Sequence, residues 1–350
     1  MAEVDIIIPL YNKADYVRRA INSILRQTIQ DWHLIVVDDG SSDNGPDIVR
    51  NIKDKRVELI QQSNQGPGAA RNAGIAQAKS NYLAFLDADD EWCPCYLANA
   101  LAAIKENDVA LVSSMYYTWP SQKDMTQSWA KRNVLAKQYE LQGSESPRWA
   151  ARLTPFMSPW NTVIRRDIAV KYDGFYGKDH CMRAEDETFF MRIAFGERFM
   201  FIGPPAVRYH TESSTIGHIP KPHPLEPFLA DPQVLLDYCP EHKKNLLHQV
   251  LDYRVLGTAR HWARYGLKTQ AQQLLERFPG ARAYRARYYR CRCEIVLSRW
   301  LPLWLKLKWA VGPRIRQSLR ILGQKSSLIQ TAPDILQSRH NHEPDKHKTQ

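Results

Sequence analysis

Acidic residues gather at one point of the sequence, directly after a short apolar run. Residues 82–86 are mostly apolar, and three of the four residues 87–90 are aspartates. The run predicts a buried strand, and side chains at the carboxyl end of such a strand lie where open α/β sheets bind ligands. Asp87 and Asp89 therefore indicate a site for Mg²⁺ or Mn²⁺, which takes one or two carboxylates and completes its shell with phosphate oxygens and water. A solvated acidic turn that caps the next helix is the alternative.

A second acidic pair, Glu185 and Asp186, stands at the expected start of a helix over residues 184–194. The helix dipole favours carboxylates in the first turn, so we expect Asp186 to be held ionised. An ionised carboxylate could take a proton as a general base. Two ordinary helix-start acids are the alternative. His210 directly follows a predicted strand, and a lone histidine in such a place is more often structural.

Alternating strands and helices are predicted to position these residues. We expect strands at 4–10, 33–37, 57–60, 82–86, 109–113 and 161–164, with helices in most of the intervals, and short strands at 198–202 and 206–209. Apolar strands that alternate with helices predict a mainly parallel sheet covered on both faces, which is a Rossmann-like α/β fold. The small residues of 66–74 open a helix that another backbone or a ligand could approach closely.

The charge is divided unevenly along the chain. Residues 1–225 contain 26 Lys or Arg and 27 Asp or Glu, whereas residues 226–350 contain 22 and 10, so the second part carries the whole formal excess of +11. The prolines of 220–232 indicate a junction. We therefore expect an α/β domain over 1–225, a basic helical region over 226–325 and a disordered tail over 326–350.

The basic helical region suggests a contact with an anionic membrane surface. Residues 282–325 contain 12 basic residues and one acid, together with Trp300, Trp304 and Trp309. Such a composition is typical of an interfacial helix, although a helix that packs its Leu and Trp face on the α/β domain is the alternative. Nucleic-acid binding is not expected, because no recognised module accompanies the charge. Without a signal-peptide pattern or an apolar window of ~18 residues, we expect a cytoplasmic protein at the inner face of the cell membrane.

Five short motifs, in this order, resemble those of the inverting family-two glycosyltransferases of GT-A fold. The motifs are Ile8–Asn12, Val37–Asp43, Gly66–Gly74, Asp87–Asp90 and the pair Glu185-Asp186, spread over residues 4–215. The residues after 225 are not covered. The resemblance implies a GT-A fold and a metal-dependent enzyme that moves a sugar from a nucleotide-sugar donor, expected to be UDP-linked, to a hydroxyl with inversion.

The resemblance also implies which residues contact the donor. Pro9 and Tyr11 match base-contacting residues at the end of the first strand. Asp39 would accept a hydrogen bond from a ring N–H of the base, and its alternative is a turn or helix-capping acid. Arg71 would lie along the base or reach the phosphates, and its alternative is an ordinary surface arginine. Asp87 matches the acid that binds the ribose.

The remaining candidates would act on the metal and on the acceptor. Asp89 matches the ligand of the Mn²⁺ or Mg²⁺ that bridges to the diphosphate, and His210 matches a further metal ligand or phosphate contact found in some members. Asp186 matches the base that removes the proton of the acceptor hydroxyl. Glu185 would bind the acceptor or orient Asp186.

The function that follows is sugar transfer to a saccharide or lipid-linked acceptor in cell-surface polysaccharide or lipopolysaccharide biosynthesis. A protein of the same fold that has lost its activity and binds a membrane surface is the alternative. A dinucleotide-dependent oxidoreductase is disfavoured, because Pro9 to Asn12 stand where a Gly-x-Gly-x-x-Gly motif would follow the first strand.

Overall fold

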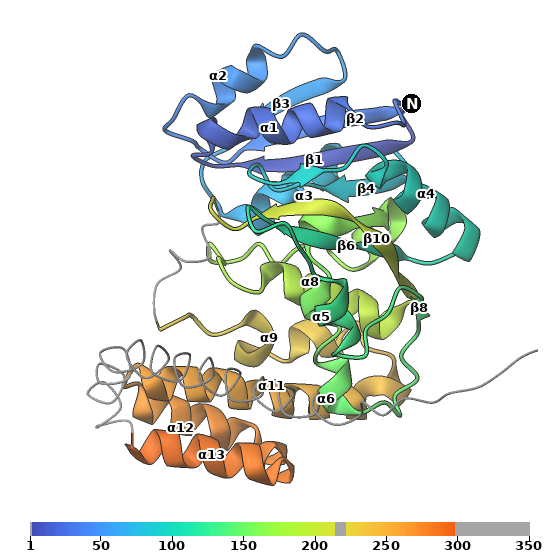
Figure 1. The fold of residues 1–350 in the computed structure, drawn as a ribbon. Coiled ribbons are helices and arrows are strands. Elements are labelled where there is room, and N and C mark those ends of the chain that lie inside the picture. Colours follow the sequence, from blue (N-terminus) through green and yellow to red (C-terminus); the bar gives the residue numbers. More distant parts are fainter. Residues whose placement is uncertain (1, 214–221, 298–350) are drawn as a thin grey trace, which may run out of the picture.

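The computed structural model describes residues 2–213 and 222–297, which form strands and helices in close alternation up to residue 210 and helices thereafter (Figure 1). The strands are β1 (Val4–Leu10), β2 (Trp32–Asp38), β3 (Val57–Gln61), β4 (Tyr82–Phe85), β5 (Glu91–Trp92), β6 (Leu111–Trp119), β7 (Lys123–Asp124), β8 (Gln138–Tyr139), β9 (Thr162–Arg165) and β10 (Phe199–His210). The helices are α1 (Ala14–Leu25), α2 (Gly45–Arg50), α3 (Pro67–Gln77), α4 (Tyr96–Asn107), α5 (Thr126–Ala130), α6 (Pro147–Ala150), α7 (Arg166–Lys171), α8 (Glu185–Gly196), α9 (Pro227–Ala230), α10 (Gln233–Leu236), α11 (Lys244–Arg264), α12 (Lys268–Arg277) and α13 (Arg285–Val296).

All the strands belong to one ten-stranded mixed sheet. Its order is β3-β2-β1-β4-β9-β6-β10-β5, with β7 paired to β6 and β8 paired to β10. The four strands from β3 to β4 are parallel, as are β6 and β10, whereas β9 runs antiparallel between β4 and β6. The predicted mixed, mainly parallel sheet with flanking helices is therefore confirmed.

The side chains of β1 divide the apolar core into two layers. Ile6 and Ile8 pack in the layer that contains α1, α2 and α4, whereas Ile7 packs in the layer that contains α3, α7 and α8. A strand buried on both faces explains the almost continuous apolar run in the sequence. Because β1, β2 and β4 are parallel, the loops that follow them meet at one edge of the sheet and bring Tyr11, Asp39 and Asp87 to that edge.

The helices after residue 222 extend one of these two layers. Phe228 of α9, Leu247 of α11 and Ile295 of α13 belong to the same buried cluster as Phe189 of α8. Figure 1 shows α11, α12 and α13 stacked at the end of the molecule far from α2. The predicted helical character after residue 225 is confirmed for the described part, while the domain boundary itself stays a prediction. The tryptophans of 300–309 and the tail 326–350 lie outside the described residues.

Two stretches differ from the sequence prediction. The two short strands expected at 198–202 and 206–209 are one strand, β10, which pairs with β6 on both sides of a register shift between Ile202 and Val207. Residues 116–150, for which the sequence predicts no strand, contain the end of β6 as well as β7, α5, β8 and α6. Trp129 anchors this stretch, because its buried ring contacts Phe156 and Phe201 at centroid distances of 4.6 and 5.2 Å. Such long-range ring packing leaves no periodic pattern in the sequence.

Candidate active site

Two loops at the edge of the sheet are tied together by polar residues of the first two motifs. Asn12 donates its backbone N–H to Ser41 Oγ at 3.1 Å and accepts the N–H of Ser42 at 2.8 Å. Asp43 accepts the N–H of Ala14, the first residue of α1, at 2.8 Å. These residues therefore hold the loops after β1 and β2 to each other. Tyr11 lies at the tip of this unit with 48% of its surface exposed, so its ring is accessible to a ligand.

Asp39 is buried and is used to position a neighbouring loop. Its carboxylate accepts hydrogen bonds from Gln62 Nε2 at 2.8 Å, from the Gln65 N–H at 2.9 Å and from the Gly66 N–H at 2.8 Å. The loop held in this way leads into α3, which carries Arg71. These three hydrogen bonds match the alternative considered for Asp39, an acid that stabilises a turn. Its role in recognition of the base stays a prediction.

Arg71 joins the first half of the chain to α8. Its guanidinium is 5% exposed and contacts Asp87 Oδ1 at 2.8 Å and Glu185 Oε1 at 3.3 Å. Burial alone would lower the pKa of Arg71, but the charges of Asp87, Glu185 and Asp186 raise it. The surface-arginine alternative is therefore wrong: Arg71 is a buried cation shared by acids that lie about a hundred residues apart in the sequence.

The small residues of α3 allow this close packing. A Cβ at Gly68 would come within 2.5 Å of the Tyr176 carbonyl oxygen and 3.2 Å of Glu185 Cγ, and one at Gly74 would come within 2.5 Å of Ile7. The glycines therefore admit other parts of the same protein rather than open space for a ligand. They place α3 directly against both the central sheet and the start of α8.

Asp186 lies at the start of α8 with little compensation for its charge. Its carboxylate accepts the Glu187 N–H at 2.7 Å. Burial raises the pKa of Asp186 to about 8, the neighbouring Glu185 raises it as well, and Arg71 opposes the shift only in part. The expectation that the helix start keeps Asp186 fully ionised is wrong, because desolvation outweighs the single backbone hydrogen bond. A carboxylate with a pKa near neutrality is well suited to accept a proton.

Asp87, Asp89 and Asp90 form a second group of crowded carboxylates. Burial, followed by the charge of Asp87, raises the pKa of Asp89, and burial together with both neighbours raises the pKa of Asp90 well above its usual range. Asp90 accepts the His210 N–H at 2.7 Å through Oδ1, while its buried Oδ2 has no hydrogen-bond partner among the described residues. The group therefore carries more negative charge than its surroundings neutralise.

Two basic residues of α1 and its start reach this group, and the sequence reasoning missed both. Lys13 Nζ contacts Asp89 Oδ2 at 2.6 Å and the Ser213 carbonyl oxygen at 2.6 Å. Arg19 donates to the carbonyl oxygen of Asp89. The position of Lys13 directly after the motif Ile8–Asn12 was the signal that could have identified it.

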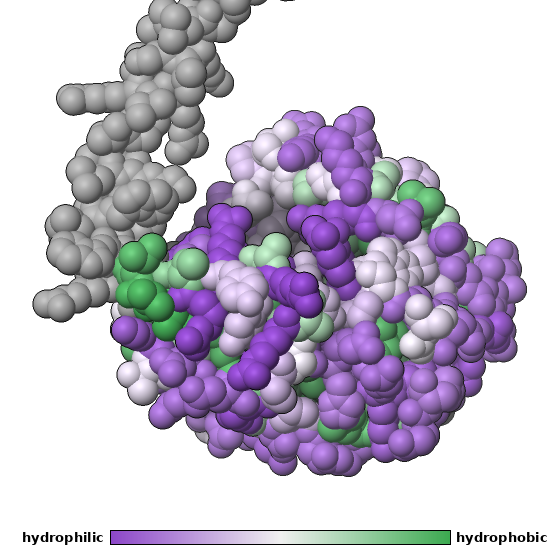
Figure 2. Space-filling model, turned by 90° about the horizontal axis from the view of Figure 1, so that it is seen from below, coloured by the Kyte–Doolittle hydropathy of each residue, from purple (hydrophilic) through white to green (hydrophobic). Residues whose placement is uncertain are grey.

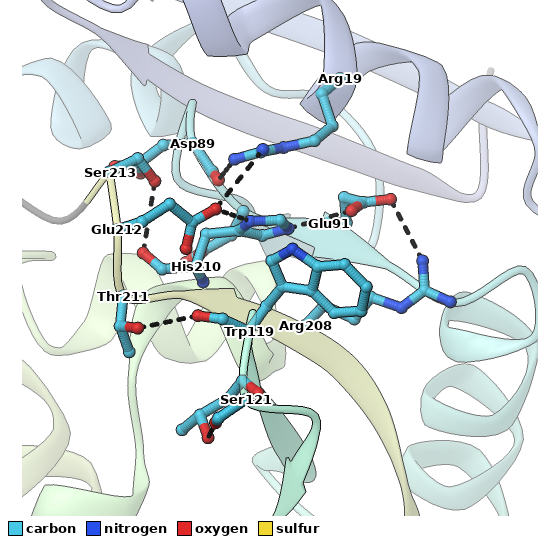
Figure 3. Close-up of polar contacts among 12 residues, drawn as sticks. Arg19, Asp89, Glu91, Trp119, Ser121, Arg208, His210, Thr211, Glu212 and Ser213 are labelled. Atoms are coloured by element: carbon cyan, nitrogen blue, oxygen red, sulfur yellow. Dashed lines mark hydrogen bonds and ion pairs between the residues drawn. The ribbon is translucent and has the colours of Figure 1, made fainter.

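His210 occupies a closed position between two acids (Figure 3). Its Nε2 lies 2.9 Å from Glu91 Oε2 and its Nδ1 lies 2.6 Å from Glu212 Oε1, and its side chain is 2% exposed. The ring of Trp119 covers it at a centroid distance of 5.9 Å. Both ring nitrogens thus face carboxylates. A metal ion could bind His210 only after one of these carboxylates moved away, and the role as a metal ligand stays a prediction.

The acidic residues fit a divalent cation that shares its ligands with a substrate. No three His, Cys, Asp or Glu side chains within residues 2–213 and 222–297 form a group able to hold a metal ion by themselves. The partnerless oxygen of Asp90 and the raised pKa of Asp89 nevertheless indicate a place where a cation would lower the energy. Asp89 offers the hard oxygen ligand that Mg²⁺ and Mn²⁺ prefer, with phosphate oxygens and water as the remaining ligands.

The structure therefore brings most of the predicted residues together. We call five residues the acidic site: Asp87, Asp89, Asp90, Glu185 and Asp186. Arg71 bridges its two halves, and the charge of Asp87 acts on both aspartates that follow it. Asp39 reaches the acidic site indirectly, through the loop that leads to α3. Pro9 lies within β1 opposite Val37, and Tyr11 stands in the loop beyond it.

Comparison with known proteins shows similarity to glycosyltransferases. Residues 5–173 match the model of glycosyl transferase family 2. An uncharacterized glycosyltransferase of Nostoc is 43% identical over 110 residues, which are 31% of this chain and 34% of that protein. The putative glycosyltransferase EpsH of Bacillus subtilis is 29% identical over 221 residues, or 61% and 62% of the two chains. The succinoglycan biosynthesis protein ExoW of Rhizobium meliloti is 39% identical over 114 residues, or 31% and 36%. The matches thus span about a third to two thirds of these relatives.

The similarity in structure extends further along the chain than the similarity in sequence. The crystal structure of residues 1–349 of S. aureus TarS in complex with UDP-GlcNAc superimposes with a TM-score of 0.64 at 19% sequence identity, over 89% of this chain and 92% of that one. At this identity the likeness concerns the fold, and it includes the helical C-terminal part. The motifs, the matched residues 5–173 and the shared fold together show that the chain carries a domain of glycosyl transferase family 2 with the GT-A fold.

Proposed function

We propose that the protein is an inverting glycosyltransferase that moves a sugar from a UDP-sugar to a hydroxyl of a saccharide or lipid-linked acceptor. The observation that carries the proposal is the convergence of Asp87, Glu185 and Asp186 on the buried Arg71, with Asp89 beside them. This convergence supports a single site that would combine the proposed donor-binding residues with a residue able to take a proton. UDP-sugars are the donor class to test first, because the TarS structure that shares this fold holds UDP-GlcNAc.

Four residues of the acidic site, Asp87, Asp89, Glu185 and Asp186, then have a role in the transfer. Asp87 binds the ribose and is fixed by Arg71, while Tyr11 and Asp39 border the place of the base. Asp186 takes the proton of the acceptor hydroxyl while the hydroxyl oxygen attacks the anomeric carbon on the face opposite the leaving diphosphate. Its pKa of about 8 makes the carboxylate basic enough for this step. Glu185 keeps that pKa high through its own charge.

A divalent cation at Asp89 would supply Lewis-acid stabilisation of the departing diphosphate. Lys13 Nζ contacts this carboxylate at 2.6 Å. We propose that Lys13 either stays as a second cation for the diphosphate or yields Asp89 to the metal ion, with His210 as a further contact.

We also propose that the enzyme works at the inner face of a membrane in the synthesis of a cell-surface polysaccharide. The net positive charge of residues 226–350 supports an attraction to anionic lipids. None of the described helices is both long and apolar enough to cross a bilayer. The face on which the C-terminal helices lie is largely hydrophilic in Figure 2, as a contact through lipid headgroups would require. Flotation of the full chain with vesicles of anionic and of neutral lipid tests this placement.

Incubation of the purified full chain with a panel of nucleotide sugars, Mn²⁺ and saccharide acceptors tests the proposed activity. We expect release of UDP and a product with the opposite anomeric configuration, identified by NMR. Release of a different nucleotide would correct the donor, and retention of the anomeric configuration would contradict the role of Asp186. Membrane binding without turnover of any nucleotide sugar would favour the inactive binding protein.

A further inference from the structure

A second charged site lies near the start of α8 and is formed by residues outside the sheet. A cavity of about 450 Å³ is lined by residues that follow α5 and α6, by residues before α8 and α9, and by α11 and α13. We call it the arginine pocket, because its lining includes five arginines: Arg132, Arg152, Arg183, Arg254 and Arg287. Its volume lies in the range of small-molecule sites, about 300–1,000 Å³.

The carboxylates near the arginine pocket neutralise only part of this charge. Glu226, the one acid in the lining, is 3% exposed and is taken by Arg183 at 2.9 Å and by the Thr258 hydroxyl. Arg254 is paired with Glu187. Among the residues that the structure describes, no ion pair joins the other three arginines to a carboxylate. Three guanidinium groups thus face the cavity without a counter-ion from the protein.

Arg287 shows the consequence most clearly. Its guanidinium lies 4.1 Å from the centroid of the Tyr253 ring, and its buried Nε has no hydrogen-bond partner among the described residues. Burial lowers the pKa of Arg287, and the charges of Arg260 and Arg254 lower it further. A ligand anion would satisfy the donor and relieve the repulsion, and phosphate matches the fork of guanidinium donors especially well.

The start of α8 connects the arginine pocket to the acidic site. Arg183, which lines the pocket, precedes Asp186 by three residues, and Glu187, the partner of Arg254, follows it directly. Thr154, which stands next to Pro155 of the pocket lining, donates a hydrogen bond to Glu187 at 3.0 Å. A molecule anchored in the pocket therefore lies against the same turn of helix that presents the proposed base.

We propose that the arginine pocket binds a phosphate or diphosphate group of the acceptor and so presents the acceptor hydroxyl to Asp186. The inference rests on the proposed function, because it names the acceptor class of the same enzyme. An acceptor of this class carries its phosphate either in a lipid-linked diphosphate or in a phosphodiester of the growing polymer. The shared chemistry is the phosphate oxygen.

Calorimetric titration of the full chain with inorganic pyrophosphate tests the pocket. The buffer contains EDTA, which withholds divalent ions from the acidic site. We expect Arg287→Gln to weaken binding by about tenfold or more. Arg285→Gln, an exposed arginine on the same helix that does not line the pocket, should stay within about twofold of the wild type. Equal affinity of the wild type and Arg287→Gln, or no binding by the wild type, would overturn the proposal.

A second variant tests whether binding requires the space of the cavity as well as the charge of its arginines. Gly257 lines the pocket, and a Cβ there would lie 3.4 Å from Arg287 Nη2. Gly257→Leu should fill the cavity and weaken pyrophosphate binding by about tenfold while every arginine is kept. Thermal melts of all variants establish that they are folded, and unchanged affinity in folded Gly257→Leu would place the anion elsewhere.

Two further probes distinguish the sources of the phosphate. Tighter binding of geranyl diphosphate than of a glycerol phosphodiester would indicate a lipid-linked acceptor, and the reverse would indicate a phosphodiester polymer. Binding of neither would overturn the assignment to the acceptor. Release of UDP from UDP-sugars, measured separately on the same samples, reports the proposed function alone, so the two failures cannot be confused.

Discussion

The acidic site and the arginine pocket carry charge of opposite sign, and both lie near the start of α8. In the acidic site, carboxylates outnumber their partners: Asp90 keeps an oxygen without a hydrogen-bond partner among the described residues, and the pKa of Asp186 rises to about 8. In the arginine pocket, guanidinium groups outnumber the acids, and burial together with its neighbours lowers the pKa of Arg287. Like charges held together in this way destabilise a fold unless a ligand of opposite charge compensates them. The difference in sign indicates which ligand each region takes.

The largest effect is expected where the chemistry itself is removed. Asp186→Asn keeps the shape of the side chain and removes the proposed base, so kcat should fall by about 10²–10⁴-fold while UDP binding stays unchanged. Asp179→Asn, an exposed acid shortly before α8, should leave kcat unchanged. Steady-state kinetics of both variants give the comparison. Full activity of Asp186→Asn would show that another residue is the base. The arginine pocket would then no longer be connected to the base through the start of α8.

The pH dependence of kcat/KM tests whether Glu185 and Asp186 of the acidic site are coupled. The carboxylate of Asp186 must lose its proton to act, so kcat/KM should rise with pH up to about 8. In Glu185→Gln the neighbouring negative charge is gone and Arg71 loses one of its acids, so the pKa of Asp186 should fall. The ratio of activity at pH 6.5 to that at pH 8.5 should then increase about threefold or more. Identical pH profiles would show that the two carboxylates are not coupled.

Asp39 differs from the acids of the acidic site, because its buried carboxylate accepts three hydrogen bonds. Asp39→Ala would leave the three donors of the loop 62–66 without their acceptor, so the free energy of unfolding should fall by about 2–3 kcal/mol. Asp47→Ala, at an exposed acid of α2, should change it by less than about 0.5 kcal/mol. Urea unfolding measures both. A loss of UDP affinity without loss of stability would instead support direct recognition of the base by Asp39.

The smallest effect is the stability gained when an unneutralised charge is removed. The folded-state pKa of Asp186 lies above its unfolded value, so the folded protein binds more protons between about pH 4 and pH 8 and loses stability as the pH rises through that window. Asp186→Asn should therefore raise the Tm at pH 8 by roughly 2–4 °C, the shift that about 1 kcal/mol produces in a domain of 150–250 residues. The gain should shrink toward pH 4. A lower Tm in the variant at pH 8 would contradict the crowding of charge in the acidic site.

Much of the acidic site could be predicted from the sequence because each of its parts is a compact motif. The acids after β4 and at the start of α8 are predicted from their places after an apolar run and at a helix start, and the sheet is predicted from the alternation of apolar strands and helices. The partners were not found, because they depend on contacts across the fold: Lys13 on Asp89, and Glu91 and Glu212 on His210.

The arginine pocket left no comparable signal. Its arginines come from five separate parts of the chain between residues 132 and 287, and no short motif contains two of them. The basic composition of the C-terminal part predicts a contact with an anionic surface, but it does not show that basic side chains line a pocket. The raised pKa of Asp186 was missed for a similar reason, since burial by distant elements decides it rather than the helix start.

Calorimetric titration of UDP into the full chain, with and without Mn²⁺, tests most directly whether the acidic site binds a diphosphate through a divalent cation. The variant Asp89→Asn serves as the comparison, and Asp179→Asn as the control. We expect Mn²⁺ to tighten UDP binding by about tenfold or more in the wild type and in the control, and by less than about twofold in Asp89→Asn. Equal tightening by Mn²⁺ in Asp89→Asn, or no effect of Mn²⁺ on the wild type, would contradict the account.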